Sequence, residues 1–130
     1  MPFSGDPATL LNSILDDIAK IEEFTQGVDR RIFEEDDRVA YAVKYALLRI
    51  SEAAHRLGDR APALCPGVEW RDIRGLGNRL RHAYDRIDAG LIWIIVEKDL
   101  APLKASAQAA RQKLQEAKNS GESPHLPKPE

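Results

Sequence analysis

The most basic stretch of the sequence lies between residues 71 and 86. It contains five arginines and His82, set against only two aspartates. Its apolar residues recur at helical spacing, at Ile73, Leu76, Leu80 and Tyr84. Because successive residues of a helix turn by about 100°, polar residues would then lie on the outer side of such a helix. These outer residues are Arg71, Arg74, Asn78, His82 and Asp85, with Arg81 at their edge.

A histidine beside several arginines suits the cleavage of RNA without a metal ion. Histidine transfers protons near neutral pH, and arginine stabilises the negative charge that develops on phosphorus. The corresponding reaction is attack of a ribose 2′-hydroxyl on the neighbouring phosphate, with His82 as the proton-transfer residue. The same pattern is also typical of a solvated or dimer-forming helix surface, so spacing alone leaves both interpretations open.

The composition indicates one domain without a general affinity for nucleic acid. The chain has 130 residues, of which 43% are apolar, and this is enough for a single core. The formal net charge is −2, so no overall positive field attracts nucleic acid. We therefore expect RNA contact to depend on the local arginine cluster, and we expect no DNA partner.

Cysteine usage and hydropathy predict a cytoplasmic protein. The single cysteine, Cys65, forms no internal disulfide, and no cluster of cysteine and histidine has the spacing of a zinc site. We expect no metal and no cofactor. The start of the sequence lacks the features of a signal peptide, and the longest apolar run, residues 91–96, is too short to cross a bilayer. No membrane partner is expected.

Apolar residues at three- and four-residue steps predict three helices in the first two thirds of the chain. These helices cover residues 7–27, 39–58 and about 70–84. Residues around 32–33 are expected in a loop. Residues 61–67 are also expected in a loop, because prolines disrupt the interior of a helix.

Two further helices complete the predicted fold. A fourth begins after Asp88, and a fifth follows Asp99 and Pro102. The predicted fold is therefore all-α, a four- to five-helix up-and-down bundle. It occupies residues 1–118, and residues 119–130 are expected to form a disordered tail because they contain prolines and no apolar pattern.

Several other residues have two interpretations. His55 near Glu52 has the spacing of a metal or acid–base pair, but a solvated helix end is favoured. Trp70 and Trp93 have side chains that can stack on bases, but a place in the core is favoured. The acidic residues 34–37 are best explained as a capping segment.

Longer segments resemble a known family. Residues 68–84 read Val-Glu-Trp-Arg-Asp-Ile-Arg-Gly-Leu-Gly-Asn-Arg-Leu-Arg-His-Ala-Tyr, and Ile-Asp follows at 87–88. Together with residues 91–103 and with Tyr-Ala-Leu-Leu-Arg-Ile-Ser-Glu-Ala-Ala at 45–54, this order resembles the HepT-like proteins of the HEPN superfamily. The resemblance covers nearly the whole chain apart from the tail.

The resemblance implies a homodimeric helical bundle that acts as a metal-independent endoribonuclease toxin. It also implies a partner, a minimal nucleotidyltransferase (MNT) antitoxin, that neutralises the toxin by adding AMP to a tyrosine. The family motif is an arginine followed by a polar residue, a histidine four to six positions beyond the arginine, and a tyrosine two further on. Asn78, His82 and Tyr84 match this motif.

The motif arginine is missing, because Gly77 occupies its position. Loss of a cation that stabilises the transition state typically lowers a rate about a hundredfold to a thousandfold. Several arginines are candidates to replace it. They are Arg74 and Arg79, if the helix bends at Gly75 and Gly77, and Arg71 and Arg81, from a partner subunit.

We therefore expect a toxin that cleaves RNA, with Asn78, Arg79 and Arg74 assisting His82 and with Arg71 and Arg81 binding RNA. The alternative is a disarmed relative that serves as a non-catalytic binding or regulatory subunit of a nucleotidyltransferase, and Gly77 favours it. A plain helical oligomer without a role in RNA or nucleotide chemistry is a third possibility. The retained motif residues argue against the third.

Overall fold

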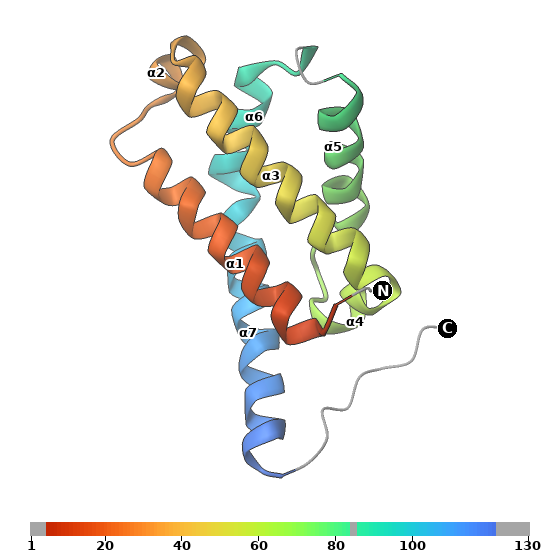
Figure 1. Ribbon diagram of the computed structural model, residues 1–130. Coiled ribbons are helices and arrows are strands. Elements are labelled where there is room, and N and C mark those ends of the chain that lie inside the picture. The colour runs from red at the N-terminus through yellow and green to blue at the C-terminus, as the bar shows by residue number, and fades with distance from the viewer. Residues whose placement is uncertain (1–4, 84–85, 122–130) are drawn as a thin grey trace.

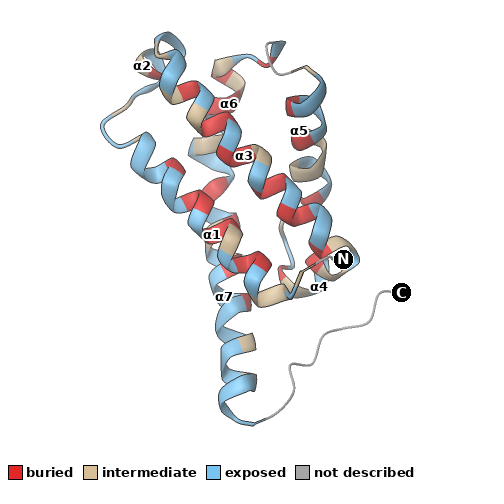
Figure 2. Cartoon of the chain, viewed as in Figure 1, coloured by how far each residue is buried: buried red, intermediate tan, exposed pale blue. Residues whose placement is uncertain are grey.

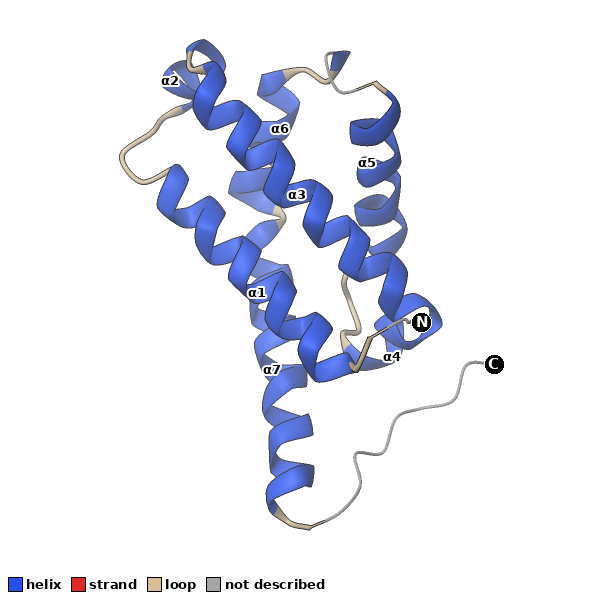
Figure 3. Ribbon diagram, in the orientation of Figure 1, coloured by secondary structure: helices blue, strands red, loops and turns tan. Residues whose placement is uncertain are grey.

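The computed structural model describes residues 5–83 and 86–121, and it contains only helices and loops within these ranges (Figure 3). A 3-10 turn at Gly58–Arg60 joins the third and fourth helices. The helices are α1 (Pro7–Phe24), α2 (Arg30–Glu35), α3 (Asp37–Leu57), α4 (Ala61–Leu64), α5 (Trp70–His82), α6 (Ala89–Lys98) and α7 (Leu100–Asn119). The prediction of an all-α bundle is confirmed. Most of the expected tail lies outside the described residues.

Aspartate caps begin the first helices. The Asp6 carboxylate accepts a hydrogen bond from the backbone N–H of Thr9, and Pro7 occupies the first turn, where no N–H donor is required. The Asp36 carboxylate accepts from the N–H groups of Arg38 and Val39 and so begins α3. Such a cap stabilises a helix by about 1 kcal/mol.

The loop expected around residues 32–33 is in fact the short helix α2. Asp29 caps it by accepting from the N–H of Ile32 at 2.8 Å. Phe33 is fully buried, and its ring lies 5.3 Å from that of Trp93 in α6. This contact joins distant parts of the chain, so local periodicity gave no sign of the helix.

The loop expected at residues 61–67 also begins as a helix. Ala61–Leu64 forms the single turn α4, and Pro62 lies in its first turn. A proline is tolerated there because the first N–H groups of a helix have no partner within the helix. The remainder, as far as Glu69, is a connection to α5.

Helix α3 lies between α1 and α5, and α6 and α7 lie behind this layer (Figure 1). Both α1 and α5 run antiparallel to α3. The buried residues form stripes that face the interior (Figure 2). Trp70 and Trp93 belong to this core, as expected from the sequence. No helix in the described part of the chain is long and apolar enough to cross a membrane.

Candidate functional site

The exposed end of α5 carries the residues expected to do chemistry. Asn78, Arg79 and His82 are all exposed, and His82 is the last residue of the helix. His82 follows Arg79 by three residues and Asn78 by four, so the three side chains are neighbours on the helix surface. The side chains of Arg79 and His82 form no hydrogen bond or ion pair with the described residues. They are therefore available to a substrate.

Two buried residues of α5 fix which of its faces points inward. Trp70 is buried, and its indole N–H donates to the backbone carbonyl of Cys65 at 3.1 Å. Leu80 is buried in the same core. These two anchors set the rotation of the helix and keep Asn78, Arg79 and His82 on its open side.

Arg81 connects the site to α3. Its guanidinium donates to the carboxylate of Glu52 with one amino group and to Oδ1 of Asn78 with the other. These bonds hold the side-chain amide of Asn78 with its oxygen toward Arg81, so the amide nitrogen is left to donate elsewhere. Arg81 is thus a bracing residue of the site as well as an edge residue of the helix.

Arg74 does not lie on the open side as expected. It is half-buried, and its Nη1 atom is fully buried without a hydrogen-bond partner among the described residues. Arg74 precedes Gly77 by three residues and Arg81 by seven, so it shares the helix face that packs on α3. It also lies about 12 Å from His82 along the helix axis, at 1.5 Å per residue.

Gly77 is buried on the face of α5 that packs against α3. A Cβ atom at this position would overlap the Oγ and Cβ atoms of Ser51. Ser51 is itself fully buried, and its hydroxyl donates to the carbonyl of Leu48 at 2.9 Å. The position that holds arginine in the family motif is therefore closed to any side chain here, because Ser51 fills the space.

The site thus contains two residues that the sequence did not single out. In the sequence Ser51 appeared only within the family-like segment at residues 45–54, and Glu52 only there and as a neighbour of His55. Their membership in the conspicuous Ile-Ser-Glu-Ala segment was the available signal. Pairing with α5 depends on how two helices cross, and spacing along one helix does not encode that.

The remaining predicted residues are distributed as follows. Arg71 is exposed near the start of α5, far from His82 along the helix, and its RNA-binding role stays a prediction. Tyr84 and Asp85 lie outside the described residues. His55 is exposed on α3. No group of three or more histidine, cysteine, aspartate or glutamate side chains in the described ranges is arranged to hold a metal ion.

The all-helical bundle, with a histidine, an asparagine and arginines at the end of one helix, is consistent with a protein of the HEPN type. The family model described as "Ribonuclease HepT-like" matches residues 14–110. The chain belongs to this HepT-like ribonuclease family, so the resemblance seen in the sequence is confirmed.

Two relatives illustrate the similarity. A protein of Methanocaldococcus jannaschii named "Putative RNase MJ1380" is 33% identical over 103 residues, which cover 79% of this chain and 94% of the relative. A protein of Thermococcus cleftensis named "Probable ribonuclease HepT" is 32% identical over 101 residues, which cover 78% of this chain and 92% of the relative. No solved structure matches the chain significantly.

Proposed function

We propose that this protein is the toxin of a HepT/MNT-type toxin–antitoxin pair and acts as a metal-independent endoribonuclease. The observation that carries the proposal is the exposed cluster of Asn78, Arg79 and His82 at the end of α5, with Asn78 braced through Arg81. Membership in the HepT-like ribonuclease family supports it. RNA is the substrate, and the active form is a homodimer in the cytoplasm.

In this mechanism His82 accepts the proton of a ribose 2′-hydroxyl. The 2′-oxygen attacks the adjacent phosphorus, and the bond from phosphorus to the 5′-oxygen of the next nucleotide breaks. The 5′-oxygen leaves with a proton from water or from the imidazolium that has formed. The products are a 2′,3′-cyclic phosphate and a free 5′-hydroxyl, and the proposed step uses only protein side chains and water.

Arg79 is the best replacement for the missing motif arginine. Its side chain is exposed beside His82 and forms no ion pair with the described residues. Arg81 is already bonded to Glu52 and Asn78, and Arg74 is half-buried against α3. Arg79 can therefore hold the negative charge that develops on the phosphate oxygens, which a guanidinium does well.

Neutralisation would occur at Tyr84, two residues after His82. The partner nucleotidyltransferase would transfer AMP from ATP to the tyrosine hydroxyl with release of pyrophosphate. The added phosphate places negative charge and bulk beside the histidine, where it competes with RNA. The family motif and the sequence position of Tyr84 support this assignment.

A second candidate function is a disarmed relative that binds the nucleotidyltransferase without cutting RNA. The contact between Gly77 and Ser51 favours it, because this contact excludes an arginine at position 77. In this case α5 would be a binding surface, and the exposed histidine would have no catalytic role.

Expression of the chain alone separates the two functions. Wild type, His82→Ala and Arg79→Ala are compared for growth arrest and for cleavage of RNA by purified protein in the presence of a chelator. We expect wild type to cleave, and we expect His82→Ala to lose about a hundredfold or more in rate. Equal, undetectable cleavage by wild type and His82→Ala would favour the disarmed relative.

A double substitution tests whether the crossing between α3 and α5 disarms the site. Gly77→Arg alone clashes with Ser51, so it is combined with Ser51→Gly, and Ser51→Gly alone is the control. An active toxin that uses Arg79 gains little from the added arginine. Activity that appears only in the double variant would establish the disarmed relative.

Modification is tested by coexpression with a minimal nucleotidyltransferase antitoxin. Intact-mass measurement should show the addition of one AMP group to wild type and none to Tyr84→Phe. Loss of growth arrest should accompany the modification. An unmodified wild-type chain would remove this part of the proposal.

A further inference from the structure

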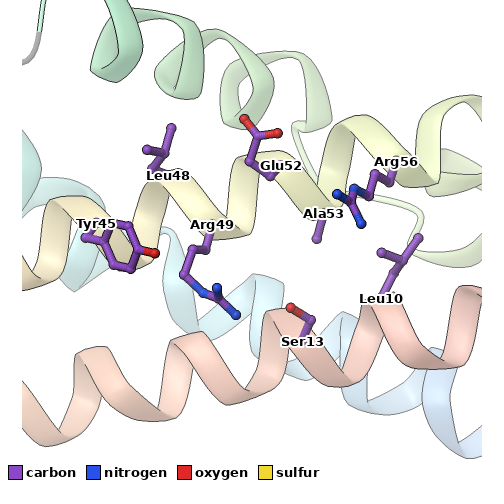
Figure 4. Close-up of a pocket in the computed structure, with 8 residues that line it drawn as sticks. All are labelled: Leu10, Ser13, Tyr45, Leu48, Arg49, Glu52, Ala53 and Arg56. Atoms are coloured by element: carbon purple, nitrogen blue, oxygen red, sulfur yellow. The ribbon is translucent and has the colours of Figure 1, made fainter. Parts of the chain in front are cut away.

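A groove of about 410 Å³ runs between α1 and α3, and of its lining residues only Glu52 also belongs to the site described above. A neighbouring hollow of about 370 Å³ shares Tyr45 and Arg49 with it and adds Lys20 and Phe24. The groove is lined by Leu10, Ser13, Tyr45, Leu48, Arg49, Glu52, Ala53 and Arg56 (Figure 4). The groove and the adjoining hollow together combine two aromatic rings, Tyr45 and Phe24, with basic side chains.

We propose that this groove binds single-stranded RNA, with a base stacked on Tyr45 and with phosphates on Arg49 and Arg56. The inference deepens the proposed ribonuclease function, and it rests on that function for the identity of the substrate. It assigns a binding surface to residues outside the motif.

Tyr45 is the most exposed of the large apolar residues in the described part of the chain. It is 60% exposed, and Phe24 in the adjoining hollow is 38% exposed. A single exposed ring is common on protein surfaces, but two exposed rings that line one hollow leave a larger apolar patch, and such patches mark binding surfaces. Aromatic side chains beside a positive groove are the usual platform for the bases of single-stranded nucleic acid.

Arg49 is held in place for contact with an anion. Its Nε atom lies 3.2 Å from both carboxylate oxygens of Asp17, whose side chain is only 2% exposed. The Asp17 carboxylate, and next a hydrogen bond with Tyr45, raise the pKa of Arg49 above its ordinary value. The Arg49 side chain is still 52% exposed. A positioned arginine loses little freedom when it binds a phosphate.

The charges of the groove favour a polyanion. Glu52 in the groove pairs with Arg81, and Asp17 in the adjoining hollow pairs with Arg49, so both carboxylates are already committed. Arg56 is exposed, and its guanidinium forms no ion pair with the described residues. The groove and its rim are thus basic on a chain whose formal net charge is −2.

The groove leads toward the candidate catalytic residues. Helices α3 and α5 are antiparallel (Figure 1), and Gly77 faces Ser51. The last turn of α5, which ends at His82, therefore lies beside the part of α3 that precedes Ser51 and carries Tyr45. Figure 4 shows Arg49 pointing toward α1, while Glu52 points away from it toward α5. A strand stacked on Tyr45 can thus continue to His82.

Binding is measured with the full-length His82→Ala chain, so that RNA stays intact. A fluorescent, uridine-rich RNA strand of about 12 nucleotides, within the usual site sizes, is titrated and followed by anisotropy. We expect Tyr45→Leu to weaken binding about tenfold, because the stacking face is lost. Tyr45→Phe keeps the ring and should bind within about twofold of the parent.

The arginine contact is tested by the salt dependence of binding. Arg56→Gln should lower the slope of log Kd against log salt concentration by about 0.7, the value for one phosphate contact on a single strand. Arg38→Gln is the matched control, because Arg38 is exposed on the same helix but does not line the groove. Its slope should equal that of the parent.

Crosslinking locates the strand directly. RNA that contains 4-thiouridine is irradiated with the His82→Ala chain, and trypsin then cuts after Lys44 and Arg49 to release residues 45–49. RNA attached to this peptide supports the proposal. RNA attached only to peptides of α6 or α7 would overturn it.

The outcomes separate this inference from the proposed function. Strong, Tyr45-dependent RNA binding without cleavage by wild type would support the RNA-binding groove and contradict the proposed nuclease function. If Tyr45→Leu cleaves and binds RNA as well as the parent does, the RNA-binding groove is contradicted and the proposed nuclease function stands. A Tyr45→Leu chain with altered assembly mass by light scattering and unaltered RNA affinity also overturns the inference, since the face would then be a protein contact.

Discussion

Helix α3 packs against α1 on one side and against α5 on the other by different physical means. Toward α1 the contact consists of large apolar side chains, with one ion pair between Asp17 and Arg49. Toward α5 the contact is a close backbone approach at Gly77, braced by the pair of Arg81 and Glu52. The first contact supplies stability through burial, and the second positions a polar face.

The difference explains why the candidate catalytic residues lie on α5. Within α5 only Trp70, Gly77 and Leu80 are buried, and the other residues of the helix are exposed or half-buried. In α1 the buried set is larger and mostly apolar: Leu10, Leu11, Ile14, Leu15, Asp17, Ile18 and Ile21. A helix that contributes few apolar side chains to the core retains more polar positions for chemistry.

The largest expected effect comes from filling the contact between α3 and α5. Gly77→Arg should lower the free energy of unfolding by about 3 kcal/mol, because any side chain there overlaps Ser51. Urea denaturation gives the value. Gly75→Arg is the matched control two residues away, since a Cβ at Gly75 meets no atom within 4 Å. It should stabilise the helix by about 0.5 to 1 kcal/mol, as replacement of glycine usually does.

A second substitution tests whether Ser51 is the residue that clashes with a side chain at position 77. Adding Ser51→Gly to Gly77→Arg should restore part of the lost stability, although a glycine within α3 itself costs about 1 kcal/mol. A double variant no more stable than Gly77→Arg would mean that an atom other than Ser51 closes the position.

The contact between α1 and α3 is tested by its buried carboxylate. Asp17→Ala should lower the free energy of unfolding by about 1 to 2 kcal/mol, because it removes a buried, packed side chain and leaves Arg49 without its partner. This is less than the 3 to 5 kcal/mol typical of a fully buried pair, because Arg49 is half-exposed and can be hydrated. Lys20→Gln, a substitution of an exposed residue on the same helix, should change stability by less than about 0.5 kcal/mol.

The pH dependence of Asp17 has a definite sign. Burial raises its pKa above the ordinary 3.8, and the hydrogen bond and charge of Arg49 offset this only in part. The folded chain then binds a proton more readily than the unfolded chain, so Asp17 contributes more stability as the pH falls through its folded pKa. The stability difference between wild type and Asp17→Ala should therefore grow from neutral pH toward pH 4 in urea titrations. A shrinking difference would mean that Arg49 lowers the pKa of Asp17 by more than burial raises it.

Much of this fold follows from local pattern, but the site does so only in part. Apolar spacing and caps predicted the long helices because both are properties of neighbouring residues. Helix α2 was missed because the burial of Phe33 depends on Trp93. The motif identified Asn78 and His82, whereas the conflict between Gly77 and Ser51 depends on how closely two helices approach. That distance is set by the whole bundle.

Arg74 offers a smaller test on the α5 side. Its Nη1 atom is buried without a hydrogen-bond partner among the described residues, and an unpaired buried polar atom is destabilising. Arg74→Met keeps much of the length and should raise the free energy of unfolding by about 1 kcal/mol, measured in urea. Arg71→Met, at an exposed position of the same helix, should have little effect. A loss of stability in Arg74→Met would show that its guanidinium has a partner.

The smallest effect on stability, and the most informative for function, is expected at Glu52. Its pair with Arg81 is partly exposed, so Glu52→Gln should change the free energy of unfolding by less than about 1 kcal/mol. Glu22→Gln is a close control, because Glu22 pairs with Lys104 away from the site and is 51% exposed, against 50% for Glu52. The two variants should therefore have similar Tm values in thermal unfolding.

Cleavage should separate these two variants where stability does not. Glu52 has no contact with the proposed reacting atoms and acts only by holding Arg81, and through it Asn78. We expect kcat for RNA to fall about tenfold in Glu52→Gln, since small misplacements of catalytic groups have effects of this order or larger. RNA affinity should not weaken, because a negative charge leaves the α1–α3 groove. Equal kcat values for Glu52→Gln, Glu22→Gln and wild type would mean that the α3–α5 brace serves packing alone.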